Sequence, residues 1–421
     1  MTFTRVRDPV LGEEVWLATS SNGLRLRVAP RPAFRETAAA ITFAYGSTDL
    51  TFADGRNIVT TPAGTAHYLE HKLFEDDELQ VFQRFAQRGA RVNAQTGFTR
   101  TTYHFQATSA FADNLQDLLR LVSRPHITAA NVDKERGIIA QEVRMYEDSA
   151  DYCTMFDLLG CLFPEHPVRY TIGGTVASIH EITADLLLHC WRAFYRCGNA
   201  ALAVAGPVDP QQVLDLAEAC ELPAGSAPDR SARHDGGPIG SPRRERSMAV
   251  ARPKVLLGCK DPTPAPDWRS RARRAAETAV VLDRLFAASS ELREALHQGG
   301  SVDDSLGCGY FGERTFGVVS AGCESEDPAR AVAALRRALL AEVRFDQEQL
   351  ERLRRRQLGS QVRVFENVRQ VAFAHAHEAI EDAPPFQALT VFDELTVDAV
   401  AERKATLLRE DNLAVAVTAR G

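Results

Sequence analysis

The sequence predicts two related halves, each of mixed strand and helix content, joined by a linker. The chain has 421 residues, which is too many for one ordinary core. The segment 222–247 is rich in Pro, Gly, Ser and Arg and almost free of apolar residues, which is the composition of a linker. The sequences on its two sides also resemble each other. We therefore expect domains at 1–221 and 248–421.

Two pairs of segments carry this internal similarity. The segment ITAANVDKERGIIAQE at 127–142 matches FDQEQLERLRRRQLGS at 345–360, and each follows a helix with periodic apolar residues. NAALAVA at 199–205 is echoed by NLAVA at 412–416, each near the end of a half. A faint internal duplication accounts for both pairs.

The first half reads as short strands interspersed with helices. Runs typical of strands lie at 24–28, 39–45, 91–96, 101–107 and 200–205. Helical spacing of apolar residues predicts helices at 78–87, 111–122, from about 128 to beyond 141, 153–162, 181–195 and 210–220. A further helix is expected within GTAHYLEHKLF at 64–74.

Composition and charge exclude several classes of protein. The chain is 45% hydrophobic and 25% charged with a net charge of −7, so it offers no basic footprint for nucleic acid. Its N-terminus does not read as a secretory signal, and no apolar run is long enough to span a membrane. The eight cysteines are scattered without a C-x-x-C pair, as in reduced, mostly buried thiols. We expect a cytoplasmic protein with neither nucleic acid nor membrane as a partner.

The motif H-x-x-E-H stands at His67, Glu70 and His71. On a helix, the two histidines lie one turn apart on one face, where two imidazoles can bind one Zn²⁺. Glu70 overhangs the same patch and is better placed to take a proton from water than to bind the metal. This order of residues is the inverzincin signature. The alternative is a partly buried helix with two unrelated histidines.

A catalytic zinc site needs a third protein ligand and one open position. The best candidate is Glu142, with Glu135 about two helical turns earlier on the same face. One carboxylate could bind the metal while the other accepts the spare N–H of a ligating imidazole. Alone, such a pair indicates a solvated face, but beside the histidine motif we prefer the metal interpretation. The second half has no H-x-x-E-H, and Ser360 stands where the first has Glu142.

The chain resembles the pitrilysin/insulinase family of zinc peptidases over nearly its whole length, and its bacterial processing-peptidase-like members most closely. The matching segments are HYLEH, VNAQTGFTRTTYHF, ERGIIAQE, EHPVRYTIGGT and NAALAVAGPVD. The resemblance implies two homologous α+β halves that enclose a chamber. It also implies that His67, His71 and Glu142 bind zinc, that Glu70 is the general base and that Glu135 supports the site.

Asn93 and Ala94 match the edge strand that lies beside the metal in this family. Such a strand holds an extended peptide through main-chain hydrogen bonds, which give affinity without fixing the sequence. Without the neighbouring motif, an ordinary strand with one polar residue would explain both positions. With it, we expect Asn93 and Ala94 to bind a peptide substrate.

The second half matches the family less completely. Family members hold the substrate with an arginine and a tyrosine from this half. Arg293 fits the arginine, but Asp303 and Asp304 stand at the expected tyrosine, and a carboxylate cannot donate a hydrogen bond to a carbonyl oxygen. Tyr310 lies too far along the chain to be assumed equivalent.

We therefore expect a zinc-dependent endopeptidase that hydrolyses peptides or unfolded segments. The incomplete second half predicts a homologous partner subunit that supplies the missing residues, which gives a heterodimer. The alternative is a homodimer or a monomer in which Tyr310 substitutes. The rival function is a non-catalytic assembly or binding subunit of the same fold, against which the intact H-x-x-E-H argues.

Overall fold

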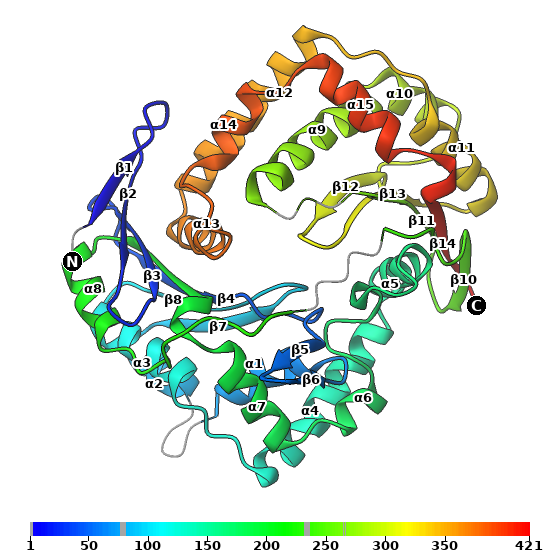
Figure 1. The fold of residues 1–421 in the computed structure, drawn as a ribbon. Coiled ribbons are helices and arrows are strands. Elements are labelled where there is room, and N and C mark those ends of the chain that lie inside the picture. The colour runs from blue at the N-terminus through cyan, green and yellow to red at the C-terminus, as the bar shows by residue number, and fades with distance from the viewer. Residues whose placement is uncertain (1–2, 76–80, 231–235, 264, 266) are drawn as a thin grey trace. The chain divides into compact units, whose positions relative to one another are not determined.

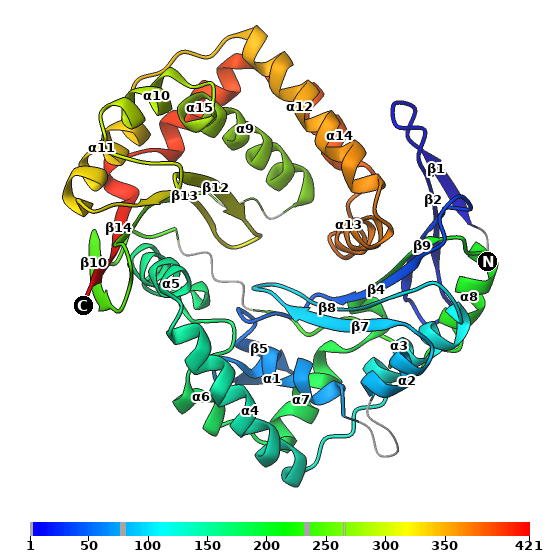
Figure 2. The same ribbon diagram turned by 180° about the vertical axis from the view of Figure 1, so that it is seen from behind.

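Two compact units make up the protein, and each contains segments from both halves of the sequence. The structure is a computed structural model that describes residues 3–75, 81–230, 236–263, 265 and 267–421. The first unit comprises Met1–Val143, Thr171–Ser231 and Ser360–Phe386, and the second comprises Arg144–Tyr170, Ala232–Gly359 and Gln387–Gly421. Figures 1 and 2 show the elements of each unit from opposite sides.

The first unit is built on a seven-stranded sheet in the order β1-β2-β3-β9-β4-β8-β7. Its strands are β1 (Thr4–Arg7), β2 (Glu14–Thr19), β3 (Arg25–Pro30), β4 (Thr37–Phe43), β7 (Arg91–Thr96), β8 (Thr101–Ala107) and β9 (Ala200–Gly206). β3 runs parallel to β9, and the other neighbours are antiparallel. β4 and β9 are buried over their full lengths because helices cover both faces of the sheet. A separate hairpin pairs β5 (Thr51–Asp54) with β6 (Asn57–Thr60).

Most helices of this unit lie on one face of the sheet (Figure 1). α1 and α2 contact β7, α3 contacts β8, and α8 contacts β3. The helices of this part of the chain are α1 (Thr65–Leu73), α2 (Val81–Gln87), α3 (Phe111–Ser123), α4 (Ala129–Glu147), α6 (Val176–His180), α7 (Ala184–Phe194) and α8 (Pro210–Glu218). The expected helix at 181–195 is thus preceded by the short α6. Positions 78–80 of the helix expected at 78–87 lie outside the described residues.

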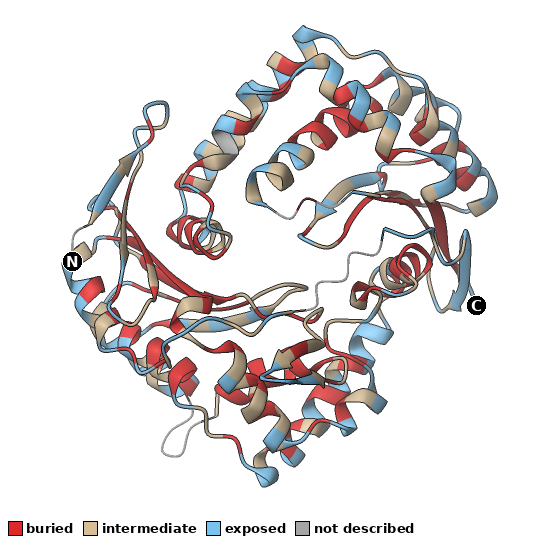
Figure 3. Cartoon of the chain, in the orientation of Figure 1, coloured by how far each residue is buried: buried red, intermediate tan, exposed pale blue. Residues whose placement is uncertain are grey.

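The opposite face of the sheet is covered by α13 (Val368–Ile380), a helix from the second half of the sequence. Along β4, Ile41 and Phe43 belong to the main core, so the strand period of two turns Ala40 to the other face. There, α13 packs Ala379 against Ala201 of β9. Small side chains on both sides let the helix lie close to the sheet, and Figure 3 shows α13 and the central strands as largely buried.

Two neutral histidines lie between this sheet and α13. His104 of β8 contacts the ring of Phe373, and His377 of α13 lies 3.4 Å from the Thr102 hydroxyl. Burial, with a smaller contribution from a nearby arginine in each case, lowers the pKa of His104 to about 4 and that of His377 to about 3. Since an unfolded histidine titrates near 6.5, the unfolded chain binds protons at a pH where the folded chain does not. The free energy of unfolding should therefore fall as the pH drops below about 6.5.

We expect acid to destabilise the parental protein more than a His104→Gln variant. Between pH 7 and pH 5, the variant should lose about 2 kcal/mol less of its free energy of unfolding, because one depressed pKa has been removed. Urea unfolding of the metal-free proteins at the two pH values measures this difference. His180→Gln, at an exposed position on α6, is the control and should behave like the parent. Equal losses in His104→Gln and parent would contradict the prediction.

The second unit repeats the strand arrangement of the first. Its five-stranded sheet has the order β10-β14-β11-β13-β12, with β10 parallel to β14 and the other neighbours antiparallel. β10, β14, β11, β13 and β12 thus correspond to β3, β9, β4, β8 and β7, and the predicted duplication is confirmed. The strands are β10 (Arg243–Met248), β11 (Lys254–Lys260), β12 (Gly307–Gly312), β13 (Gly317–Glu324) and β14 (Leu413–Arg420).

Helices also cover both faces of the second sheet. α5 (Ala150–Leu162), from the first half of the sequence, packs on β10, β11 and β14, while α9 and α11 contact the other face (Figure 2). The two halves have therefore exchanged a helix, since α13 makes the equivalent contacts in the first unit. The remaining helices are α9 (Trp268–Phe286), α10 (Glu291–Gln298), α11 (Pro328–Leu340), α12 (Gln347–Phe365), α14 (Gln387–Asp393) and α15 (Val397–Leu407).

This exchange makes the compact units differ from the contiguous domains expected at 1–221 and 248–421. The expected linker at 222–247 also contains regular structure at two places in its described length. Arg230 forms an isolated bridge with Phe52, and Arg243–Met248 forms β10. Composition did not reveal β10 because it is a charged edge strand, whose Arg246 pairs with the buried Asp157 of α5. Residues 231–235 lie outside the described part of the chain.

All eight cysteines lie in the described residues and are free thiols, seven of them buried and Cys308 exposed. Burial raises the pKa of the Cys259 thiol to about 12 and that of Cys190 to about 11. Such thiols are packing groups rather than nucleophiles or metal ligands. Among the described residues, no helix combines the length and apolar character needed to cross a bilayer.

Candidate metal and catalytic site

α1 carries the H-x-x-E-H residues, and the backbone around its first turn is tightly constrained. The helix begins after Gly64, whose φ of 96° lies in the left-handed region that favours glycine. A Cβ at Gly64 would lie 2.5 Å from the carbonyl oxygen of Gly173. A Cβ at Gly173 would in turn lie 3.6 Å from Nδ1 of His67. Glycine at 64 therefore lets the loop at Gly173 pack against the start of α1, and a Cβ at Gly173 would make only ordinary van der Waals contact with the first histidine.

Two hydrogen bonds from buried residues hold α1 against α4. The Tyr68 hydroxyl donates to the carbonyl of Val132 at 2.5 Å, and Lys72 Nζ donates to the carbonyl of Asn131 at 3.0 Å. Both donor residues are fully buried. Because Tyr68 and Lys72 fix one side of α1 to the start of α4, the predicted histidine pair faces the predicted glutamate pair.

His67, His71 and Glu142 come together as the sequence predicted. One potential ligand atom from each lies within 4.8 Å of the others. Nε2 of His67 is 3.7 Å from Oε1 of Glu142, and Nε2 of His71 is 3.3 Å from Oε2 of Glu142. Ligands about 2.0–2.1 Å from a tetrahedral Zn²⁺ are roughly 3.3–3.4 Å apart, so these separations fit a zinc ion without rearrangement of the helices. Two imidazoles and one carboxylate are also a donor set that catalytic zinc uses.

Glu135 lies behind His71, where it orients the ring. Its Oε1 is 3.0 Å from Nδ1 of His71, which leaves Nε2 of the same ring directed at Glu142. Burial lowers the pKa of His71, but hydrogen bonds to Glu135 and Glu142 outweigh it and raise this pKa to about 9. The hydrogen bonds from His67 and then His71 hold the pKa of Glu142 well below its usual range. The cluster therefore stabilises positive charge between its carboxylates.

Glu70 is not part of the group of three potential ligands. Glu70 is 8% exposed, and its Oε2 accepts a hydrogen bond from the hydroxyl of Thr96 on β7. Sequence reasoning placed Glu70 beside the histidines but did not identify Thr96. The available signal was the strand period of two, which gives Thr96 the same orientation as Ala94 on the strand beside the motif.

Asn93 and Ala94 lie on β7, at the edge of the seven-stranded sheet. Ala94 lies opposite Tyr103 of β8, yet its N–H donates to Oδ1 of Asn93 at 2.9 Å. That N–H is therefore directed to the open edge of β7 rather than to β8. The open edge has the geometry that an added peptide strand would need.

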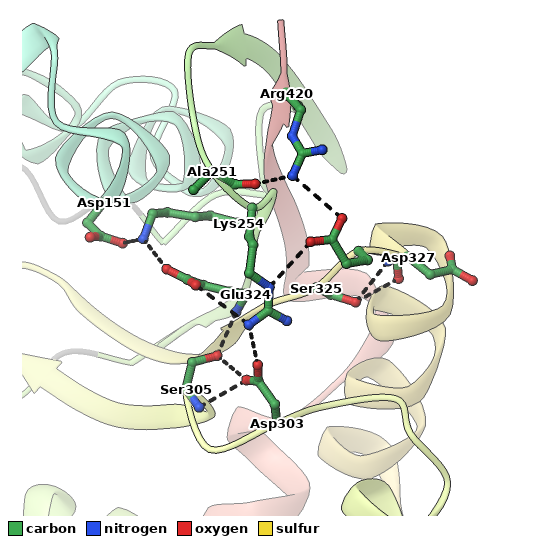
Figure 4. Close-up of polar contacts among 11 residues, drawn as sticks. Asp151, Ala251, Lys254, Asp303, Ser305, Glu324, Ser325, Asp327 and Arg420 are labelled. Carbon is green, nitrogen blue, oxygen red and sulfur yellow. Dashed lines mark hydrogen bonds and ion pairs between the residues drawn. The ribbon is translucent and has the colours of Figure 1, made fainter.

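Arg293 and Asp303, the two positions of the second unit compared with the family's substrate-holding residues, both form hydrogen bonds within that unit. Arg293, on α10, donates from Nη1 to the carbonyl of Phe286 at 3.0 Å. Asp303 accepts from Arg252 at 2.6 Å and from the backbone N–H of Ser305 at 3.0 Å (Figure 4). Asp303 thus belongs to a network of ion pairs at one end of the second sheet.

Tyr310 belongs to another polar network of the second unit. Its hydroxyl donates to Oδ2 of Asp261 at 2.8 Å, and Arg403 donates to both oxygens of the same carboxylate at 3.1 and 2.6 Å. Burial raises the pKa of Tyr310 well above its ordinary value. The Asp261 and Arg403 side chains are 0% and 4% exposed, so Tyr310 completes a buried structural network.

Comparison with known proteins identifies the family. The model described as Insulinase (Peptidase family M16) matches residues 59–175, and the one described as Peptidase M16 inactive domain matches residues 181–357. An uncharacterized zinc protease of Bacillus subtilis, YmfH, is 33% identical over 412 residues, covering 96% of each chain. An uncharacterized zinc protease of Mycobacterium leprae is 29% identical, covering 68% of this chain and 65% of its own. The chain belongs to the M16, or insulinase, family of peptidases.

Solved structures agree with this fold. The crystal structure of an M16-like peptidase from Alicyclobacillus acidocaldarius has a TM-score of 0.90 and 30% identity, covering 99% of this chain and 100% of the other. A protease from Helicobacter pylori has a TM-score of 0.80 at 19% identity, covering 96% and 99% of the two chains, which shows a shared fold. The arrangement of two related halves is therefore that of M16 peptidases.

Proposed function

We propose that this protein is a zinc-dependent endopeptidase. The observation that carries the proposal is the cluster of His67, His71 and Glu142, with separations of 3.3 and 3.7 Å between Nε2 atoms and the Glu142 carboxylate. Glu135 supports His71 from behind, as a ligating imidazole requires. The names of the relatives from Bacillus subtilis and Mycobacterium leprae, both zinc proteases, support the same metal and reaction.

The residues of the site have different roles in peptide hydrolysis. Zinc, when bound, supplies Lewis acidity that polarises the scissile carbonyl and acidifies water. Glu70, outside the ligand group, takes the proton of the attacking water and delivers it to the leaving amine. Its carboxylate is aimed by the Thr96 hydroxyl and does not compete for the metal.

Substrate binding is proposed along β7. An extended peptide would add to the open edge at Asn93 and Ala94, so that main-chain hydrogen bonds place a peptide bond near α1. Main-chain recognition favours unfolded segments, since a folded substrate has few unpaired backbone groups. Arg293 is proposed as a further substrate contact through the N–H groups that do not bind Phe286.

The alternative of a non-catalytic subunit rests on the match to a domain described as inactive. That match covers residues 181–357, whereas His67, His71 and Glu142 fall within the matched segment 59–175 of the insulinase model. A subunit without catalytic activity needs neither a complete ligand set nor a separate, oriented carboxylate. The geometry of the site therefore favours the peptidase.

We further propose that a homologous partner completes the active enzyme. The Tyr310 hydroxyl donates its proton to Asp261, and Asp303, which stands at the expected tyrosine, is a carboxylate paired with Arg252, so neither residue can donate a phenolic hydrogen bond to a substrate. A partner of the same fold that carries the missing tyrosine would supply it, which makes this chain the catalytic subunit of a heterodimer. The free thiols of all eight cysteines favour a reducing compartment, and we propose the cytoplasm.

The experiment is digestion of unfolded peptides by the purified protein, with and without a co-expressed homologue. We expect cleavage that is abolished by a chelator, restored by Zn²⁺ and strongly increased by the partner. Tyr310→Phe should leave the partner-dependent rate unchanged, because the partner supplies the phenol. Full cleavage by the isolated chain would overturn the heterodimer. Absence of cleavage from the zinc-loaded pair would instead favour the non-catalytic alternative.

A further inference from the structure

Thr96 links the edge strand to the proposed catalytic base. It is the last residue of β7, and it pairs across the sheet with Thr101, the first residue of β8. Its Oγ1 lies 2.5 Å from Oε2 of Glu70, the shortest separation at which a hydroxyl donates to a carboxylate. The contact joins two elements, β7 and α1, that are separated in the sequence by α2.

The direction of this hydrogen bond follows from the supply of protons. A threonine hydroxyl has one proton to donate. The Thr101 hydroxyl donates its proton to the carbonyl of Tyr45 at 2.8 Å, so toward Thr96 it can only accept. Thr96 Oγ1 lies 3.4 Å from Thr101 Oγ1 but much nearer to Glu70, and an ionised carboxylate is the stronger acceptor. The Thr96 proton therefore goes to Glu70.

We propose that Thr96 is the positioning residue for the general base, an inference that rests on the proposed peptidase function. Glu70 has several rotatable bonds, and its carboxylate must lie beside the metal without replacing one of its ligands. The hydrogen bond from Thr96 holds one oxygen, Oε2, and we assign the proton of the water to the other oxygen, Oε1. Thr96 thus fixes which carboxylate oxygen receives the proton.

This arrangement also couples substrate binding to the base. Thr96 follows Ala94 by two residues, so both side chains point to the same face of β7, the face toward α1. A peptide added to the open edge of β7 and the carboxylate of Glu70 are then positioned by the same strand. A displacement of about 1 Å in such an alignment can cost a hundredfold in rate.

The test is a pair of substitutions, of which one removes the hydroxyl and the other keeps it. Thr96→Val keeps the branched shape but cannot donate, whereas Thr96→Ser keeps the donor. We expect Thr96→Val to lower kcat roughly ten- to a hundredfold, with KM, zinc content and Tm near parental values, and Thr96→Ser to restore most of the rate. Thr60→Val, on the exposed strand β6, is the matched control and should leave kcat unchanged. Crystal structures of parent and Thr96→Val provide a readout independent of turnover, in which the Glu70 carboxylate should leave its parental position while α1 does not move.

Several outcomes would overturn the role of Thr96. They are a parental kcat in Thr96→Val, an equally slow Thr96→Ser, or an unmoved Glu70 carboxylate in the Thr96→Val crystal structure. If the zinc-loaded parent, with or without a partner, cleaves no peptide, the peptidase function fails. The crystal structures then still decide whether Thr96 positions Glu70, so the two failures are distinguishable.

Discussion

Glu70→Gln is expected to retain stoichiometric zinc and to cleave peptides roughly two to four orders of magnitude more slowly than the parent. The amide keeps the size of the carboxylate and can still accept from Thr96, but it cannot take a proton from water. Zinc should stay because Glu70 lies outside the group formed by His67, His71 and Glu142. The prediction therefore separates the proton acceptor from the metal ligands.

The measurement combines metal analysis with the rate of peptide cleavage at saturating substrate. Glu147→Gln, at the exposed end of α4, removes a carboxylate that contacts none of the ligands and serves as the control. Cleavage by Glu70→Gln at the parental rate would exclude Glu70 as the base. Loss of zinc from Glu70→Gln would mean that Glu70 is a ligand.

His71→Ala is expected to lose zinc on purification. Two ligands then remain, and a catalytic zinc site uses three from the protein. The substitution also removes the imidazole that contacts Glu135 at 3.0 Å and Glu142 at 3.3 Å, so both carboxylates lose the same partner. Zinc affinity should fall by more than the roughly 10- to 100-fold that loss of a hydrogen bond supporting a ligand costs.

Zinc competition against a chromogenic chelator gives the affinity for each variant. His180→Ala, on the exposed side of α6, should match the parent, and Glu142→Gln should also bind zinc more weakly. Stoichiometric zinc in purified His71→Ala would refute the assignment of the ligands. A normal affinity in Glu142→Gln would remove Glu142 alone from the set.

The sequence predicted that His67, His71 and Glu142 lie close together because the geometry that brings them together is mostly local. His67 and His71 are one helical turn apart, and the spacing of Glu135 and Glu142 places both on one face of α4. Their meeting depends on Tyr68 and Lys72, which bond to the main chain of α4 and have no sequence signature. The resemblance to a known family supplied that long-range information.

The exchange of helices and the role of Thr96 could not be predicted in the same way. The sequence predicted a helix at 153–162, within α5, but the apolar face of a helix does not indicate which sheet the helix will cover. The hydrogen bond between Thr96 and Glu70 depends on the register of β7 with β8 and on the approach of α1. The register of these strands and the position of α1 beside them depend on the packing of the whole unit, which local sequence patterns do not specify.

The helix that covers the first sheet has a consequence for biosynthesis. A ribosome makes the chain from its N-terminus, and domains generally fold as units while synthesis continues. The first unit is not complete until residue Phe386, because α13 is its cover over β3, β4 and β9. The alanine-rich face of the nascent sheet must therefore stay exposed, or be shielded by a chaperone, while the intervening residues of the second unit are translated. If the chain were divided within 222–247 and the halves were expressed separately, the first sheet would lack α13 and its apolar face would stay exposed. We therefore expect the separate halves to be insoluble.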